Sequence, residues 1–377
     1  MTEIYVIRHA QAEGNLYHMM QGTWDGDVTA LGLRQIDALA ERFRHIPIDA
    51  LYSSDLYRTR LTASAITRWH DVPIQLDKRL REMHVGPWET QFFANVGQDY
   101  PEEFRAFISD PEHFHLDGAE SYIYVRERTA EALREIALLN PGRTVAVVTH
   151  GLAIRCMLSG VCGIPLDDTA ALPIFTNTGV AKLQYENGVF TPVYINDHSH
   201  LSPELMPRAD RPLALRHEYI DPAMHRDYYI ACYTDAWLAA HGSLDGFSPE
   251  PYYTAAKAHY EADSESVAVI YSGSEPIGLV DMDTLRGAHA GYGWISLLYL
   301  NSDFRSKGYG IQLLGRAIGK YGRLGRNALR LLVSEDNGAA IGFYKKYGFR
   351  RLSAQPGTNA ELLLMERRLG GVNHGNV

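Results

Sequence analysis

Two arginines and two histidines stand where strands are expected to end or helices to begin. Arg8 and His9 follow the apolar run "IYVI", which is long enough for a buried strand and too short for a helix. His150 follows a second apolar run, "TVAVVT", and Arg58 lies just after a third predicted strand. Ligands of α/β sheets bind at the carboxyl ends of the strands, so we expect one rim of a sheet to collect these side chains.

These residue types suit phosphoryl transfer through a phosphohistidine. The planar fork of arginine matches phosphate oxygens, and a neutral imidazole can attack phosphorus in line. Neighbouring positive charge keeps the imidazole deprotonated and neutralises charge on the equatorial oxygens, the work that Mg²⁺ does elsewhere. Glu82, in the loop "LREMHVGPWE", is the candidate acid for the leaving alkoxide and, as a carboxylate, the candidate base for water. We therefore expect no metal.

A metal hydrolase is the alternative interpretation of the same histidines. The possible ligands are His9, His18, His150 and the "HSH" at 198–200, but Arg8 flanks His9, and clustered arginines repel a divalent cation. The "HFH" at 113–115 and the "HSH" lie in polar segments, which is typical of solvated loop histidines. Short histidine spacings without carboxylates at ligand spacing are weak evidence for a metal, so the metal-free interpretation is favoured.

The elements that would hold these residues follow two patterns. The first half alternates β-branched strands with amphipathic helices, one of them capped by Thr29, and closes on two strands joined by Asn187-Gly188, a hairpin signal. The second half is an antiparallel meander followed by a helix that starts at a Gly-rich turn. Between them, residues 201–216 hold three prolines and no periodicity, which predicts an extended linker.

The composition is that of an ordinary globular protein, and it excludes several classes. The chain has 377 residues, long enough for two or three domains. A formal net charge of −9 argues against nucleic-acid and membrane-surface partners, which usually need a basic face. Three cysteines without a CxxC pair argue against a disulfide or zinc framework. Neither a signal peptide nor a membrane span is visible, so a cytoplasmic protein is expected.

Four segments of the first half, "RHAQAEGN", "SSDLYRTRLTA", "LREMHVGPWE" and "VVTHG", resemble in order and spacing the motifs of the histidine phosphatase (phosphoglycerate mutase-like) superfamily. The resemblance implies an α/β phosphoglycerate mutase-like domain over residues 1–205. It also implies that His9 is the phosphorylated nucleophile and Glu82 the general acid. The residues it implies for the phosphate pocket, most of them catalytic as well, are Arg8, Asn15, Arg58 and His150.

The first half departs from the family pattern at three positions. Ala10 stands where the family has glycine, which is tolerable at a negative φ but crowds the backbone near the phosphate. Ala12 lacks the hydroxyl of the usual serine or threonine, and Thr90 replaces a glycine that commonly follows the "WE" pair. These departures bear on the rate and the substrate more than on the reaction type.

The segment 91–118, which is expected to cap the site, bears on the choice between a phosphatase and a phosphoglycerate-type mutase. A mutase must shield its phosphohistidine from water and hold a carboxylated substrate. The segment offers Arg105 but no dense basic cluster, so a phosphomonoesterase for a small phosphorylated metabolite is favoured. Its aromatic side chains either line a pocket for an apolar leaving group or, more commonly, pack the cap itself; they are Phe92, Phe93, Tyr100, Phe104 and Phe107.

The Gly-rich turn "RSKGYG" of the second half could cradle a pyrophosphate, because its glycines allow close approach and the helix after it offers free N–H groups. Together with "EDNGAAIGFYKKYGF" it resembles the GNAT acetyltransferase family. The resemblance implies an α+β GNAT (acyl-CoA N-acyltransferase) domain at 213–370, after a linker at 206–212, with Tyr344 as the acid for the departing thiolate. The residues it implies for acetyl-CoA binding are Leu300, Arg305, Ser306, Lys307, Gly308, Tyr309, Gly310 and Asn337.

The base for the acceptor amine stays open. Asp281 and Asp283 are candidates, and a chain of waters is an equal alternative. The sequence thus predicts a bifunctional enzyme, a histidine phosphatase fused to an acetyl-CoA-dependent N-acetyltransferase. A phosphoglycerate-type mutase in the first half, or a non-catalytic binding or sensing module in one half, are the alternatives.

Overall fold

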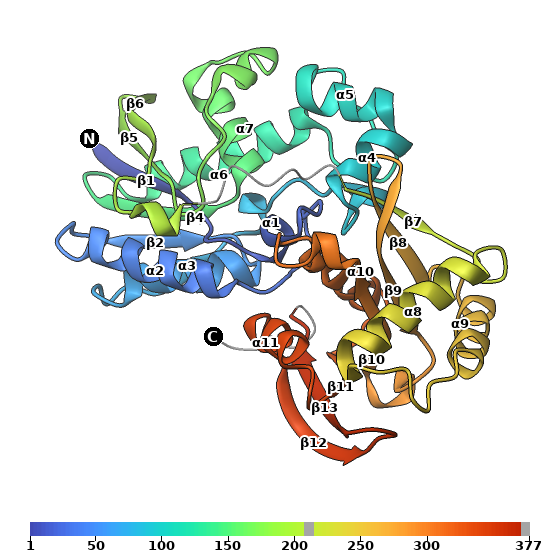
Figure 1. The fold of residues 1–377 in the computed structure, drawn as a ribbon. Coiled ribbons are helices and arrows are strands. Elements are labelled where there is room, and N and C mark those ends of the chain that lie inside the picture. The colour runs from blue at the N-terminus through green and yellow to red at the C-terminus, as the bar shows by residue number, and fades with distance from the viewer. Residues whose placement is uncertain (207–214, 371–377) are drawn as a thin grey trace. The chain divides into compact units, whose positions relative to one another are not determined.

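The computed structural model describes residues 1–206 and 215–370 of the chain (Figure 1). Each of these two ranges forms one compact unit. The linker predicted at 206–212 lies outside the described residues, apart from Met206. Each unit has a sheet of its own, with six strands in the first and seven in the second.

The sheet of the first unit has the strand order β3-β2-β4-β1-β5-β6. The first four of these strands run parallel, and β5 and β6 form an antiparallel hairpin. The predicted turn at Asn187-Gly188 is confirmed, because both residues have a positive φ, 52° and 82°. The strands are β1 (Thr2–Arg8), β2 (Ala50–Ser53), β3 (Ile74–Leu76), β4 (Thr144–Thr149), β5 (Val180–Glu186) and β6 (Val189–Asp197).

Helices cover both faces of this sheet (Figure 1). Ile4 and Val6 of β1 pack against α6 and α7, whereas Tyr5 and Ile7 pack against α2 and α3, as the alternation of strand side chains requires. The predicted cap at Thr29 is confirmed, since its side chain accepts a hydrogen bond from the Gly32 amide. The helices are α1 (Glu13–Tyr17), α2 (Ala30–Phe43), α3 (Tyr57–Thr67), α4 (Phe93–Asp99), α5 (Pro101–Ser109), α6 (Tyr122–Leu139) and α7 (Gly151–Cys162).

The aromatic side chains of the cap segment pack mainly on one another. Trp88 is fully buried, and its ring centroid lies 5.6–6.2 Å from those of four neighbouring aromatic rings. Those rings belong to Tyr100, Phe104, Phe107 and Phe114. Of the two interpretations of this aromatic segment, packing of the cap is therefore confirmed for these side chains.

The sheet of the second unit has the strand order β12-β13-β11-β10-β9-β8-β7. The predicted meander is confirmed, because β7 to β10 pair antiparallel in chain order. The strands are β7 (Leu215–Tyr219), β8 (Val267–Ser272), β9 (Glu275–Asp283), β10 (Tyr292–Leu300), β11 (Ala328–Ser334), β12 (Arg350–Pro356) and β13 (Glu361–Arg368). The helices are α8 (Arg226–His241), α9 (Glu250–Ala262), α10 (Gly310–Arg323) and α11 (Gly338–Lys346).

The two central strands of the second unit, β10 and β11, are paired over only part of their length. Their parallel pairing runs from Tyr292 to Ile295 of β10, although β10 continues to Leu300. At the same point the register of β10 against β9 shifts, between Ile295 and Leu297. The ladder between β10 and β11 therefore stops midway, and the pocket described below is lined by both strands beyond that point.

None of the helices within residues 1–206 and 215–370 has the length and hydropathy that a membrane span needs.

Candidate active sites

His9 is held as a neutral imidazole. It follows β1, is 4% exposed, and its Nδ1 lies 2.7 Å from the carbonyl oxygen of Ala10. A carbonyl only accepts hydrogen bonds, so the ring proton is assigned to Nδ1 and the lone pair to Nε2. Burial, followed by the charges of Arg58 and Arg8, lowers the pKa of His9 well below its ordinary value. The imidazole therefore has the protonation state that attack on phosphorus requires.

Arg8 offers a buried N–H to a ligand. Its Nη1 donates to the carbonyl of Phe175, while its Nε is buried and has no hydrogen-bond partner among the described residues. A Cβ at Gly151 would lie 3.2 Å from this Nε, so glycine lets the guanidinium lie close to the start of α7. Burial lowers the pKa of Arg8 to about 10, against the opposing charge of Glu82. A buried cation with an unused donor is suited to an anion.

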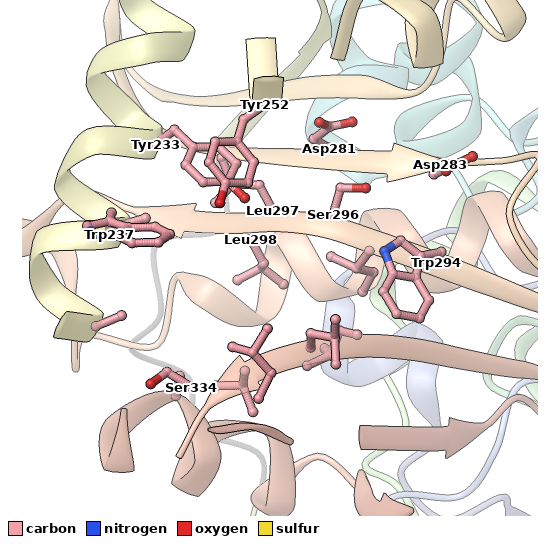
Figure 2. Close-up of a pocket in the computed structure, with 18 of the residues that line it drawn as sticks. Tyr233, Trp237, Tyr252, Asp281, Asp283, Trp294, Ser296, Leu297, Leu298 and Ser334 are labelled. Carbon is pink, nitrogen blue, oxygen red and sulfur yellow. The ribbon is translucent and has the colours of Figure 1, made fainter. Parts of the chain in front are cut away.

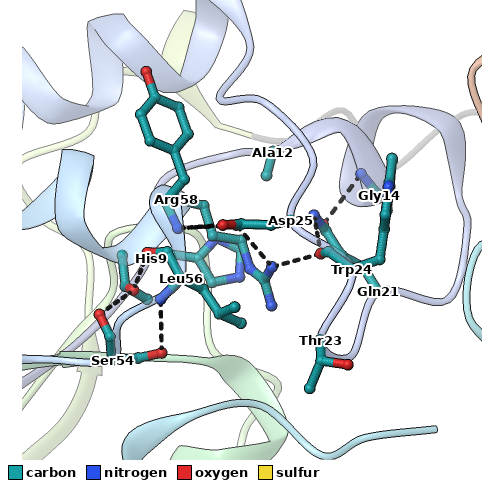
Figure 3. Close-up of polar contacts among 12 residues, drawn as sticks. His9, Ala12, Gly14, Gln21, Thr23, Trp24, Asp25, Ser54, Leu56 and Arg58 are labelled. Atoms are coloured by element: carbon teal, nitrogen blue, oxygen red, sulfur yellow. Dashed lines mark hydrogen bonds and ion pairs between the residues drawn. The ribbon is translucent and has the colours of Figure 1, made fainter. Parts of the chain in front are cut away.

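Arg58, on α3, is fully buried and is fixed by backbone carbonyls. It donates to Gly22 O at 2.7 Å. It also donates to Trp24 O at 2.9 Å, and its Nη1 lies 3.8 Å from Asp25 Oδ1 (Figure 3). Burial lowers the pKa of Arg58, and the charge of Asp25 opposes this shift. The sequence analysis found Arg58 but not the loop that holds it, because nothing local marks that loop.

His150 completes the buried cluster. Its Nδ1 accepts from Arg58 Nε at 3.2 Å, its Nε2 lies 2.9 Å from Ser54 Oγ, and its ring centroid is 5.2 Å from that of His9. Burial, followed by the charges of Arg58 and His9, lowers the pKa of His150 well below its ordinary value. The structure thus brings together the predicted residues Arg8, His9, Arg58 and His150.

Glu82 is anchored on the N-terminus of α7. Its Oε1 accepts from Ala153 N at 2.9 Å, and its Oε2 accepts from Leu152 N at 3.1 Å. Its charge acts on both Arg8 and Arg58. The carboxyl group is therefore part of the predicted cluster, but one oxygen must turn away from the helix before it can serve a leaving group.

Asn15 presents its amide nitrogen. Its Oδ1 accepts from Ala12 N at 3.0 Å and from Asn177 Nδ2 at 3.1 Å, so the amide NH₂ is the part left for a ligand. Asn177 also donates to His9 O at 3.1 Å, and it is 3% exposed. The sequence analysis missed Asn177, whose signal is the polar run "TNTG" directly before β5.

The three departures from the family pattern have different structural consequences. Ala10 is buried, its amide donates to Thr62 Oγ1 at 2.9 Å, and it is not among the residues with a positive φ, so its methyl group is accommodated. Ala12 precedes α1 without a side-chain cap. Thr90 has φ 64°, the left-handed region that a β-branched residue adopts only under strain.

The loop histidines differ from one another. His113 and His115 are exposed, as expected, and each pairs with a nearby aspartate. The same expectation is wrong for His200, which is partly buried and lies 3.2 Å from Arg42 Nη1 and 3.1 Å from Thr178 Oγ1. Within the described ranges, no group of three or more His, Cys, Asp or Glu side chains is arranged to hold a metal ion.

A pocket of about 480 Å³ opens in the second unit, between α8, α9, α11 and the central strands (Figure 2). Of the predicted residues, Tyr344, Asn337, Asp281 and Asp283 line it. Asn337 caps α11, because its side chain accepts from Ala340 N at 3.1 Å. Burial raises the pKa of Tyr344, so its hydroxyl keeps its proton at neutral pH.

The predicted residues Leu300 and 305–310 do not line this pocket. The Arg305 side chain turns back, donating to Leu300 O and to Asp235 Oδ2, each at 2.8 Å. Ser306 and Gly308 have positive φ values of 61° and 87°, directly before α10 begins. Turns with positive φ before a helix are a common setting for backbone N–H groups that bind anions.

An imidazole between two carboxylates lies in the wall of the pocket. Asp281 is 1% exposed and accepts from Tyr229 Oη and from His259 Nδ1, each at 2.8 Å. The other ring nitrogen of His259 lies 3.4 Å from Asp283 Oδ2. Burial lowers the pKa of His259, but the hydrogen bond and the charge of Asp281, with help from Asp283, raise it overall. The sequence analysis proposed both aspartates and missed the histidine.

Comparisons with known proteins agree with this division. The family model of the histidine phosphatase superfamily (branch 1) matches residues 4–198, and that of the acetyltransferase (GNAT) family matches residues 224–349. "Phosphoserine phosphatase 1" of Hydrogenobacter thermophilus is 31% identical over 166 residues, which cover 44% of this chain and 79% of the relative. "Probable phosphoglycerate mutase GpmB" of Escherichia fergusonii is 30% identical over 186 residues, covering 49% and 86%.

A solved structure, "Bacillus stearothermophilus YhfR", superposes on the same part of the chain. It is 30% identical, has a TM-score of 0.52, and covers 53% of this chain and 99% of that one. Both resemblances noted in the sequence, and the two fold classes they imply, are confirmed.

Proposed function

The chain belongs to the histidine phosphatase superfamily and carries a GNAT acetyltransferase domain, and on that premise we propose that it is a bifunctional enzyme. The first domain hydrolyses the phosphomonoester of a small metabolite, and the second transfers an acetyl group from acetyl-CoA to an amine. The observation that carries the first activity is the buried, neutral His9, whose Nε2 lone pair is left available beside Arg8 and Arg58.

In the first chemical step, Nε2 of His9 forms a bond to phosphorus while the ester P–O bond breaks. Glu82 donates a proton to the departing alkoxide. Arg8, Arg58 and the Asn15 amide stabilise the charge on the equatorial oxygens. In the second step, Glu82 takes a proton from water, the water oxygen attacks phosphorus, and the P–N bond breaks to release phosphate.

Trapping of the phosphoenzyme tests this mechanism. The full chain, mixed with a panel of phosphomonoesters and quenched, should carry acid-labile phosphate, and H9A should carry none and turn over no substrate. A chelator should leave the wild type unaffected. His70, which lies 2.9 Å from Phe43 O and outside the cluster, supplies the control H70A, which should behave as wild type. Acid-labile, covalently attached phosphate on H9A, or inactivation of the wild type by the chelator, would contradict the proposal.

A phosphoglycerate-type mutase is the second candidate, because the relative from Escherichia fergusonii carries that name. The segment 91–118 favours hydrolysis, since Arg105 is its only Arg or Lys. With 3-phosphoglycerate as substrate, a phosphatase releases inorganic phosphate and a mutase releases an isomer. Accumulation of the isomer would replace the first candidate with the second.

The acetyl-transfer proposal is supported by the pocket beside the interrupted β10–β11 ladder. Acetyl-CoA supplies the acetyl thioester, and the residues for its acyl end are Leu297 and Leu298 on β10 and Asn337 before α11. The amine, in its neutral form, bonds through its nitrogen to the acetyl carbon as the C–S bond breaks. Tyr344 protonates the thiolate, and the proton that the nitrogen loses passes through water to restore the Tyr344 hydroxyl. Backbone N–H groups of 306–310 bind the pyrophosphate.

Calorimetry with acetyl-CoA tests the second activity before any acceptor is known. We expect heat of binding from the full chain. Absence of both heat and a thermal shift would favour the alternative in which the second domain is a non-catalytic module.

A further inference from the structure

We propose that the acceptor of the second domain is a free α-amino acid with an aromatic side chain. This rests on the acetyl transfer proposed above and names the substrate class of that site. The pocket has aromatic rings at one end and Trp294 with Asp283 at the other, and Asp281 lies between them (Figure 2). The strand register agrees with this order, because Leu297 lies opposite Asp281 and Trp294 lies opposite Asp283.

The aromatic end is formed by α8 and α9. The rings of Tyr233 and Tyr252 are stacked with their centroids 4.1 Å apart, and the ring of Trp237 is 6.2 Å from that of Tyr252. All three side chains line the pocket. Such a surface binds a flat apolar group by stacking and by burial of apolar area. It provides no acid or base for the acetyl transfer.

The two carboxylates give this wall of the pocket a negative charge that matches one ammonium group. Two carboxylates, Asp281 and Asp283, face the single imidazole of His259, so the trio has a net charge of −1 when the ring is protonated. Asp281 is 1% exposed, whereas the Asp283 side chain, whose Oδ1 accepts from the Leu285 and Arg286 amides, keeps 23% of its surface exposed. Leu297, proposed above to hold the acyl end, is the cross-strand partner of Asp281. An amine held here would lie beside the thioester.

The far end of the pocket offers a cation. The Arg286 guanidinium carbon lies 3.3 Å from the centre of the Trp294 ring, and both residues line the pocket. Within the described part of the chain, the Arg286 side chain makes no hydrogen bond or ion pair. Stacking holds the plane of the guanidinium and leaves its N–H edge free, which is the geometry that binds a carboxylate through two parallel hydrogen bonds.

An α-amino acid with an aromatic side chain satisfies all three surfaces together. Its carboxylate pairs with Arg286, its amine lies near Asp283, and its ring stacks at the aromatic end. A polyamine would bring a second cation toward Arg286. An amine without a carboxylate leaves Arg286 unused, and an amino acid without a ring leaves Tyr233 and Tyr252 unused.

The test uses the full chain with acetyl-CoA and follows release of the CoA thiol. L-phenylalanine is compared with phenethylamine, which lacks the carboxylate, and with L-alanine, which lacks the ring. We expect kcat/KM for L-phenylalanine to exceed both by about tenfold or more, since each analogue leaves a binding group unpaired. Equal or better use of phenethylamine would overturn the proposal.

Two variants test which end of the pocket binds the carboxylate of the acceptor and which end binds its ring. R286Q should raise KM for L-phenylalanine about tenfold and leave that for phenethylamine unchanged. Y252L should raise KM for L-phenylalanine about fivefold and leave that for L-alanine unchanged. The control is R216Q, because Arg216 also stacks on an aromatic ring, that of Tyr271 at 4.2 Å, but lies outside the pocket lining. R216Q should leave KM unchanged for both L-phenylalanine and phenethylamine. Equal effects of R286Q on both amines would overturn the proposal.

Binding separates this proposal from acetyl transfer itself. If acetyl-CoA binds and amines other than L-phenylalanine are acetylated better, the acceptor class is wrong and the proposed function stands. If no amine releases CoA, the proposed function fails, and calorimetry with L-phenylalanine alone decides the acceptor class. Heat that R286Q abolishes would support the amino-acid site, and no heat from the wild type would overturn it.

Discussion

The two candidate sites differ in how their polar groups are held. In the first unit, Arg58 and His150 are fully buried and bonded to each other, and Arg58 is tied to two backbone carbonyls as well. In the second, polar groups lie in the wall of a pocket of about 480 Å³, and the Arg286 guanidinium stacks on the Trp294 ring.

This difference corresponds to what each site is proposed to bind. A phosphoryl group has one size and charge, so donors fixed in advance stabilise its transition state without reorganisation. An acceptor varies in shape, and a pocket with separated polar ends selects among acceptors by burial and charge. Substitutions in the first site should therefore reduce the rate, whereas those at the ends of the pocket should reduce selectivity.

The largest effect expected from a single substitution beyond the nucleophile is at Glu82. E82Q cannot donate a proton, so turnover of alkyl phosphates should fall about 10³-fold, while that of p-nitrophenyl phosphate, with its good leaving group, should fall much less. Steady-state kinetics with both substrates measure this. E135Q, at an exposed carboxylate of α6 that pairs with Arg79, is the control. An equal loss of turnover on both substrates would mean that Glu82 is not the acid and only caps α7.

In the second unit, loss of the proposed acid, Tyr344, should reduce the rate less. Y344F removes only a hydroxyl, so acetyl-CoA should bind as before and the chemical step should slow by about 10²-fold. Binding is measured by calorimetry and transfer by CoA release. Tyr347, on the turn after α11 and outside the pocket lining, provides the control Y347F. Unchanged transfer by Y344F would mean that another group protonates the thiolate.

Acid should destabilise the first unit more than the second. The pKa values of His9 and His150 are lowered by burial, so below the ordinary histidine pKa of about 6.5 the unfolded chain binds more protons than the folded one. The two neutral histidines contribute their full stabilisation above about pH 6.5. Below that pH, the free energy of unfolding falls by about 1.4 kcal/mol per pH unit for each histidine.

In the second unit, the pKa values of two histidines shift in opposite directions. Burial lowers the pKa of His217, whereas the pKa of His259 is raised, so the stabilisation by His259 is complete below about pH 6.5 and lost only as the pH rises through its folded pKa. Hydrogen exchange of β4 and β8 in the full chain, at pH 7.0 and 5.5 and corrected for intrinsic rates, measures both units. Equal losses of protection would contradict the expected difference.

The smallest effect concerns the turn before α10. A side chain at Gly308, φ 87°, is strained whatever binds there, so G308A alone cannot reveal a ligand site. Gly325, φ 65°, has no atom within 4 Å of an added Cβ, so G325A is a matched control for the strain. Both should lose about 1 kcal/mol of stability, and only G308A should weaken acetyl-CoA binding. Equal binding by the two variants would exclude this turn from the site.

The parts of the molecule that could be predicted depend on short-range structure. Arg8 and His9 were found because they follow a buried strand, Thr29 because its side chain caps the helix that starts beside it, and Asn187-Gly188 because the turn needs a positive φ. Helix α6 and strand β12 were not predicted. β12 is almost wholly exposed and shows no alternation of polar and apolar residues.

The supporting residues of both sites were found only in the tertiary structure. Asn177 bonds to His9 across 168 positions, Ser54 lies beside His150 across 96, and His259 reaches Asp281 across 22, from a helix to a strand. The sequence by itself predicted the candidate groups Arg8, His9 and His150, because strand ends are set by interactions within a few residues, whereas Tyr344 came only with the family resemblance. Only the tertiary structure decided which side chains, distant along the chain, contact these groups. The reason is that such elements come together only when the whole sheet packs around its core.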